Sequence, residues 1–162
     1  MFDVLVYVYE HYWRGDSCPE LPLLGRKLSA AGFDPDEIQQ ALSWLAGLNN
    51  AAQHADLIEL QPSQPPSAYA QSPHSMRVYS DEEQRHLGAA CLGFLTFLES
   101  AGVISAQMRE IVVDRAMAVT DHPVSLDDLK IIVLMVFWSA GIEPDALVLD
   151  ELCDDSGDRL AH

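Results

Sequence analysis

The residues that could carry chemistry in this chain do not fall into the spacings that metal sites require. Six histidines and three cysteines are present, but no two histidines stand four residues apart, the spacing that places two ligands on one helix face. His86 and Cys91 are five residues apart, which turns them to different faces of a helix. We therefore expect no metal and no cofactor.

Nucleophilic chemistry has no recognisable motif either. The chain contains no G-x-S-x-G stretch and no glycine-rich phosphate loop. Cys91 falls on the apolar stripe of an expected helix, where burial is the simpler interpretation. Glu110 and Asp114 share a helix face, but such pairs are inevitable among 25 acidic residues. We expect no catalytic residues. The alternative is an enzyme whose residues converge only in three dimensions.

The charge is strongly unbalanced, with 25 acidic against 9 basic residues and a net charge of −16. Such a field repels phosphates and anionic lipid and favours basic partners. Cys18, Cys91 and Cys153 are too widely spaced for a disulfide framework, which fits a reducing cytoplasm. The apolar start carries Asp3 where a signal peptide would be basic, and the apolar run at 131–138 is too short to span a bilayer. We expect a cytoplasmic protein that does not enter membranes.

Apolar periodicity predicts a mainly α-helical protein. The expected helices are 2–13, 19–31, 35–48, 81–101, 106–119 and 126–140, with a last short helix at 143–153. Four pairs have the spacing of a helix cap and its acidic partner: Ser17–Glu20, Asp34–Glu37, Ser80–Glu83 and Ser125–Asp128. The helix at 126–140 is apolar nearly all round, so we expect it at the centre of the fold.

Two short β-leaning runs, 57–60 and 76–79, flank the proline-rich segment 61–75. They predict a β-hairpin with a long mobile loop. Three helices followed by a hairpin would give a winged-helix-like N-terminal unit over 1–80. A C-terminal helical bundle would follow over 81–153, with a frayed acidic tail at 154–162.

Six blocks of sequence, in this order along the chain, resemble the bacterial Smg family. They are MFDVLVYVYEHY, AGFDPDEIQQALSWL, SMRVYSDEE, GFLTFLE, REIVVDRAMAV and LDDLKIIVLMVFW. The resemblance implies a domain of unknown function with no established functional residues to carry over. It also implies a genomic neighbourhood that includes a DNA-processing protein. The proline-rich segment looks longer here than in the family pattern.

Two surfaces are candidates for interaction. Trp44 and Gln40 lie away from the main apolar stripe of their helix, and tryptophan is enriched at interface hot spots. The alternative for Trp44 is that it packs on a neighbouring helix. In the expected strand at 76–79, Arg77 and Tyr79 face outward and Met76 and Val78 inward. Arg77 and Tyr79 form the second candidate surface.

Direct binding of duplex DNA is disfavoured, because the expected recognition helix at 35–48 contains no lysine or arginine and begins with acids. A nucleic-acid-associated module linked to DNA processing remains an alternative, with Arg26, Lys27, Arg77 and Arg85 as contacts. We expect instead a non-catalytic interaction adaptor whose partner is a basic protein, such as a nucleic-acid enzyme.

Overall fold

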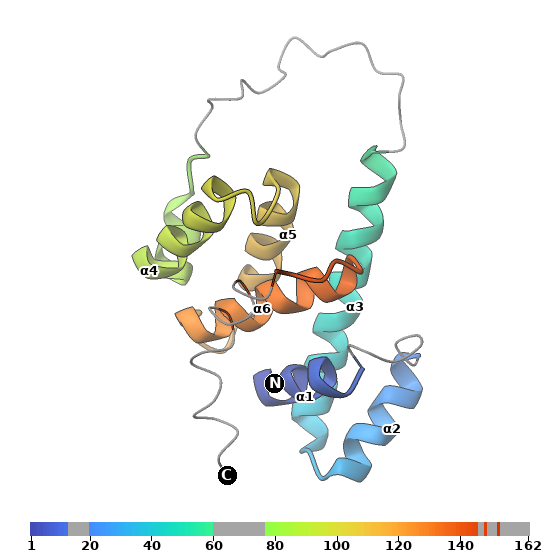
Figure 1. The fold of residues 1–162 in the computed structure, drawn as a ribbon. Coiled ribbons are helices and arrows are strands. Elements are labelled where there is room, and N and C mark those ends of the chain that lie inside the picture. Colours follow the sequence, from blue (N-terminus) through green and yellow to red (C-terminus); the bar gives the residue numbers. More distant parts are fainter. Residues whose placement is uncertain (13–19, 60–76, 146–147, 149–151, 153–162) are drawn as a thin grey trace.

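The structure is a computed structural model that describes residues 1–12, 20–59 and 77–145, together with residues 148 and 152. Within these ranges the chain forms six helices and no strand (Figure 1). They are α1 (Phe2–Tyr12), α2 (Leu21–Ala31), α3 (Pro35–Glu59), α4 (Asp81–Ser100), α5 (Ala106–Met117) and α6 (Leu126–Ser139). All six predicted helices are therefore confirmed. Of the predicted helix at 143–153, residues 143–145 are described and are not helical, whereas Val148 and Leu152 are described and helical.

The predicted capping chemistry is present at two helix starts in full. The Ser80 hydroxyl accepts from the Glu83 backbone N–H, and the Glu83 carboxylate accepts from the Ser80 N–H. Ser125 and Asp128 make the same reciprocal pair at the start of α6. Each pair satisfies two backbone donors that the first helical turn would otherwise leave unpaired.

The other two predicted caps have different outcomes. Asp34 accepts a hydrogen bond at Oδ1 from the backbone N–H of Asp36, two residues on. Ser17 lies outside the described residues. The residue that flanks the start of α2 is Glu20, which makes no side-chain capping bond.

Helix α6 lies at the centre of the fold, as predicted. Every residue from Asp128 to Phe137 is buried, and the helix packs against α1, α3, α4 and α5. One hydrophobic core includes buried side chains from all six helices. The predicted division near residue 80 into two parts stays a prediction, and the predicted loop at 61–75 and tail at 154–162 lie outside the described residues.

The predicted β-hairpin and winged-helix-like arrangement are wrong. Residues 57–59, expected as one arm, are the end of α3, which continues eleven residues beyond the predicted end at Leu48. After Asn50 the sequence is alanine-rich and contains no proline before Pro62, so helix propensity carries the helix onward. Residues 77–80 are irregular, because the described chain offers them no neighbouring strand.

Helix α4 contains a break at Gly88 that periodicity did not predict. Its backbone has φ of 69° and ψ of 169°, in a region that only glycine adopts without strain. The break takes the His86 carbonyl out of the regular helical pattern, and this carbonyl accepts from the Val124 backbone N–H at 3.0 Å. Cys91, beyond the break, donates from Sγ to the Val124 carbonyl at 3.5 Å. The two parts of α4 thus hold the segment before α6 from both sides.

None of the helices in the described ranges is long and apolar enough to cross a lipid bilayer.

Gly88→Ala should lower the free energy of unfolding by about 1–3 kcal/mol, because alanine is strained at this backbone conformation. Gly93→Ala is the matched control in the same helix. A Cβ there would meet no atom within 4 Å, and alanine should stabilise a helical position by up to about 1 kcal/mol. Urea unfolding of both variants measures the difference. Equal effects at the two positions would show that the break is not a constraint on the fold.

Candidate functional site

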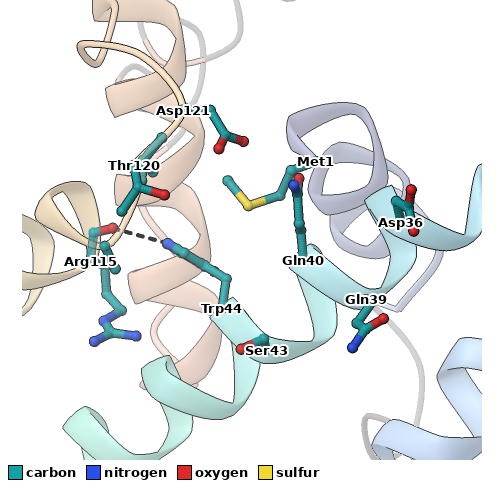
Figure 2. A pocket seen from close by; sticks show the side chains of 11 residues that line it. Met1, Asp36, Gln39, Gln40, Ser43, Trp44, Arg115, Thr120 and Asp121 are labelled. Atoms are coloured by element: carbon teal, nitrogen blue, oxygen red, sulfur yellow. Dashed lines mark hydrogen bonds between the residues drawn. The ribbon is translucent and has the colours of Figure 1, made fainter.

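A groove of about 590 Å³ opens where the start of α1, the first half of α3 and the end of α5 meet (Figure 2). Its lining is mostly polar and comprises Met1, Asp36, Gln39, Gln40, Ser43, Trp44, Arg115, Ala118, Val119, Thr120 and Asp121. Two of these residues, Trp44 and Gln40, form the first predicted interaction surface. Gln40 is exposed, so the structure places this part of the prediction on a hollowed face.

Trp44 is a wall of this groove rather than an exposed anchor. Only 4% of the residue is exposed, and its indole Nε1 donates to the backbone carbonyl of Arg115 at 2.9 Å. Figure 2 shows Trp44 between Gln40 on one side and Thr120 on the other. The packing alternative for Trp44 is therefore the one that the structure supports. The hydrogen bond ties α3 to the end of α5, 71 residues along the chain.

Two positive groups line the groove, and the chain neutralises both. The N-terminal ammonium of Met1 lies 3.2 Å from Glu37 Oε1. The Arg115 guanidinium lies 2.7 Å from Asp114 Oδ2, and it occupies the space beside Gly47 that a larger residue would fill. By contrast, the carboxylates of Asp36 and Asp121 have no ion-pair or hydrogen-bond partner among the described residues.

The second predicted surface, Arg77 and Tyr79, lies at the junction of α4 and α5. Arg77 donates to Glu83 through Nη1 at 2.9 Å and Nη2 at 2.8 Å, and to Glu110 through Nε at 2.9 Å. Its guanidinium carbon lies 4.4 Å from the centroid of the Tyr79 ring. Arg77 is thus held from α4, from α5 and by a neighbouring aromatic face.

The orientation predicted for this segment is reversed. Arg77 and Tyr79 turn inward and are half-buried, whereas Val78 is 86% exposed. The charged groups decide the orientation, because Arg77 reaches the carboxylates of both Glu83 and Glu110 on the inner side. Burial of Val78 in its place would remove the bonds from Arg77 to both acids. Met76 lies outside the described residues.

A second arginine extends the network. Arg109 donates from Nη1 to Glu99 Oε1 at 2.5 Å and from Nη2 to Glu110 Oε1 at 2.8 Å. Glu110, which was considered with Asp114 as a carboxylate pair, is therefore shared between Arg77 and Arg109. Asp114 pairs with Arg115 instead, so the two carboxylates do not act together.

These contacts shift the ionisation of the carboxylates. Hydrogen bonds from Arg77 are the main reason that the pKa of Glu83 falls to about 2. Burial alone would raise the pKa of Glu110, but hydrogen bonds from Arg77 and Arg109 outweigh burial and lower it. The same bonds, first from Glu83 and then from Glu110, raise the pKa of Arg77. The network is structural, since its charges satisfy one another.

Comparison with known proteins gives a family match over the whole chain. Residues 1–162 match the family described as "Protein of unknown function (DUF494)". A Protein Smg homolog of Methylibium petroleiphilum and one of Leptothrix cholodnii are each 57% identical over 162 residues, covering all of both chains. The Protein Smg homolog of Bordetella pertussis is 46% identical over 163 residues, again with full coverage. The chain belongs to the Smg family. The resemblance seen in the six sequence blocks is thereby confirmed.

No solved structure matches the chain. The family description assigns no activity to this Smg-family chain. A proposal for its function therefore rests on the charges and contacts of the structure.

The basic residues considered for nucleic-acid contact do not form one patch. Arg77 is bound within the network, and Arg85 donates from Nε to the Asp81 carbonyl on α4. Arg26 and Lys27 lie on α2, which is far from α4 in Figure 1. Lys27 Nζ lies 5.2 Å from the centroid of the Tyr12 ring. The described residues do not form the predicted β-hairpin on which this nucleic-acid contact depended.

Cys91 is a buried packing residue, as predicted. It is 1% exposed, and burial raises the pKa of its thiol to about 11, so little thiolate is present at neutral pH. The His86 ring lies with Nε2 3.2 Å from the Ala116 carbonyl. Among the described residues, no three histidine, cysteine or acidic side chains group closely enough to hold a metal ion.

Sequence reasoning found one wall of the groove and missed the other. The α3 wall followed from polar residues that lie off the apolar stripe of their helix. The opposite wall, at residues 118–121, carries no local motif. The one signal that could have identified it is the acidic Asp121, four residues beyond the end of α5 at Met117, since basic residues are the usual choice near a helix C-terminus.

Trp44→Phe should lower the free energy of unfolding by about 1–3 kcal/mol, because it leaves the partly buried Arg115 carbonyl without its indole donor. Trp138→Phe is the control, since the indole N–H of the half-buried Trp138 has no partner among the described residues. Thermal and urea unfolding compare the two. A larger loss for Trp138→Phe would contradict the importance assigned to the α3–α5 hydrogen bond.

Arg77→Met should lower the free energy of unfolding by about 1–2 kcal/mol at pH 7. A carboxylate whose folded pKa is depressed stabilises the fold above its ordinary pKa, 4.5, and this contribution is lost as the pH falls toward about 2. The difference between wild type and variant should therefore shrink at low pH. Urea unfolding at pH 7 and at about pH 3, on either side of the isoelectric point, measures it.

Arg85→Met, on the exposed face of α4, serves as the control and should change stability by less than about 0.5 kcal/mol at both pH values. A loss for Arg77→Met that is the same at both pH values would mean that packing of the side chain, and not its charge, is what matters.

Proposed function

We propose that this Smg-family protein is a cytoplasmic, non-catalytic adaptor that binds a basic protein partner. The observation that carries the proposal is the distribution of charge over the described surface. The chain has a net charge of −16, and the arginines at the α3–α5 and α4–α5 junctions, Arg77, Arg109 and Arg115, are bound by its own acids. Little positive charge is therefore left to screen the remaining carboxylates.

Exposed carboxylates lie on several elements of the fold. The exposed acids whose side chains make no hydrogen bond or ion pair with other described residues are Asp3, Glu10, Glu20, Asp36, Asp81, Glu82, Asp121 and Glu143. Such a surface accelerates the approach of a positively charged protein and disfavours wrong partners that carry negative charge. It also opposes direct contact with nucleic-acid phosphates.

The thiol chemistry supports the cytoplasmic part of the proposal. Cys91 is a free, buried cysteine, and the three cysteines of the chain have no spacing typical of a disulfide framework.

Affinity capture with the tagged full-length chain from a lysate of its own bacterium tests this proposal. The expected partner has a basic isoelectric point, survives nuclease treatment, and is lost between about 50 mM and about 300 mM salt because screening weakens exposed charge pairs. A variant with Glu10→Gln, Glu20→Gln, Asp81→Asn and Glu82→Gln should retain less of it. A partner that resists salt and is indifferent to these changes would refute the charge argument. A partner lost with nuclease would indicate association through nucleic acid instead.

A further inference from the structure

We propose that the groove between α1, α3 and α5 is the docking site for an arginine- or lysine-bearing segment of the basic partner. This inference deepens the proposed function and rests on it, because it names the place on the surface that binds the partner's positively charged side chain. Three properties of the groove support this docking site: its negative charge, the polarity of its walls and its rigidity.

The electrostatic potential in the groove is negative because, among the described residues, its positive groups are paired and its two carboxylates are not. Its two positive groups, the N-terminal ammonium of Met1 and the guanidinium of Arg115, are bound by Glu37 and Asp114. Asp36 on the α3 wall and Asp121 on the opposite wall have no partner among the described residues, so they set the local potential. At the α4–α5 junction the opposite holds, since Glu83, Glu99 and Glu110 are each paired with an arginine.

The end of α5 adds to the attraction for a cation. Ala118 and Val119, which follow its last residue, line the groove. A helix presents its carbonyl groups and the negative end of its dipole at this terminus, which favours a positive side chain. Asp121 lies on the same wall. Asp36 lies in the first turn of α3, where the positive end of that helix offsets part of its charge. We therefore place the partner's cation nearer to Asp121 than to Asp36.

The remaining walls suit an extended polar segment. Gln39, Gln40, Ser43 and Thr120 line the groove and are exposed, so amides and hydroxyls are available to the backbone of a bound peptide. Figure 2 shows Gln40 and Met1 on one side and Thr120 and Asp121 on the other, with Trp44 between them. A volume of about 590 Å³ is enough for one long side chain and the residues beside it.

The walls are also held in place before any partner binds. The Trp44 indole bonds to the Arg115 carbonyl, and Arg115 lies against Gly47 on the same face of α3. A groove that does not need to be assembled avoids part of the ordering cost of binding.

A titration followed by NMR tests this docking site. The full-length, 15N-labelled chain is titrated at low salt with an acetylated and amidated peptide, Gly-Arg-Gly-Arg-Gly, and in a second arm with the same peptide carrying citrulline in place of arginine. The expected result is a set of shifts confined to Gln40, Ser43, Thr120, Asp121 and the Trp44 indole N–H. The citrulline peptide, which keeps the shape and loses the charge, should produce none of them.

Two charge-matched variants decide between the groove and the general field. Asp36→Asn with Asp121→Asn should weaken peptide binding about tenfold, the combined effect of two exposed ion pairs. Asp81→Asn with Glu82→Gln removes the same charge from the first turn of α4 and should weaken it less than about twofold. Of the two groove positions, Asp121→Asn alone should cause the larger loss.

The possible failures are distinguishable. If both variant pairs weaken binding equally, or if the shifts spread over the whole surface, the groove is not the docking site while the acidic adaptor stands. If the arginine peptide does not bind the wild-type chain at low salt, the groove is not a docking site for a cationic segment, and affinity capture of a basic partner decides the proposed function separately. If the citrulline peptide binds equally well, the groove recognises shape rather than charge, and the inference is overturned.

Discussion

The fold depends on the need to cover helix α6 on every side. Its residues from Leu129 to Phe137 are apolar except for Lys130, and each is buried. A helix without a polar face cannot rest on one neighbour, so α1, α3, α4 and α5 must surround it. These four neighbours come from both ends of the chain. Helices α1, α3 and α5 lie around α6 (Figure 1), and residues at the start of α1, in the first half of α3 and after the end of α5 line the groove.

The acidity of the chain is compatible with this packing because its arginines are used internally. Arg77 joins the segment before α4 to α4 and α5, and Arg109 joins α5 to the end of α4. Networks of partly buried, bidentate pairs hold their geometry better than isolated surface pairs. This use of arginine relieves repulsion within the α4–α5 junction and leaves other acids unpaired. The paired acids therefore stabilise the α4–α5 junction, whereas the unpaired acids give the protein its negative external field.

The sequence predicted those features that depend on neighbours close along the chain. The six helices, the capping boxes at Ser80 and Ser125, the burial of Cys91 and the central place of α6 all follow from local periodicity and capping chemistry. The interaction surface at Gln40 and Trp44 stays a prediction. An exposed Trp44 is not what the structure shows, because the side chain is buried and its indole N–H donates to the Arg115 carbonyl, 71 residues away.

The errors share this physical origin. The extent of α3 depended on whether 57–59 would find a strand partner, and they remain helical. The direction of Val78 was decided by Glu110, which lies 33 residues from Arg77 and attracts its guanidinium inward. Alternation of apolar and polar residues predicts only that neighbours in a strand face opposite ways. It does not predict on which side the acidic partners of Arg77 lie. The break at Gly88 was missed because the Val124 N–H, which donates to the His86 carbonyl beside the break, lies in a different segment.

The contact between Trp44 and Arg115 connects stability to the proposed recognition. The backbone carbonyl of Arg115 accepts the indole N–H, and its side chain lies against Gly47, three residues after Trp44 on α3. The end of α5 therefore cannot shift along α3 without disturbing both contacts. Because the groove lies between these two helices, the interactions that hold them together also fix the separation of Asp36 and Asp121. A partner that places a cation between these walls would gain from a spacing that folding has already set.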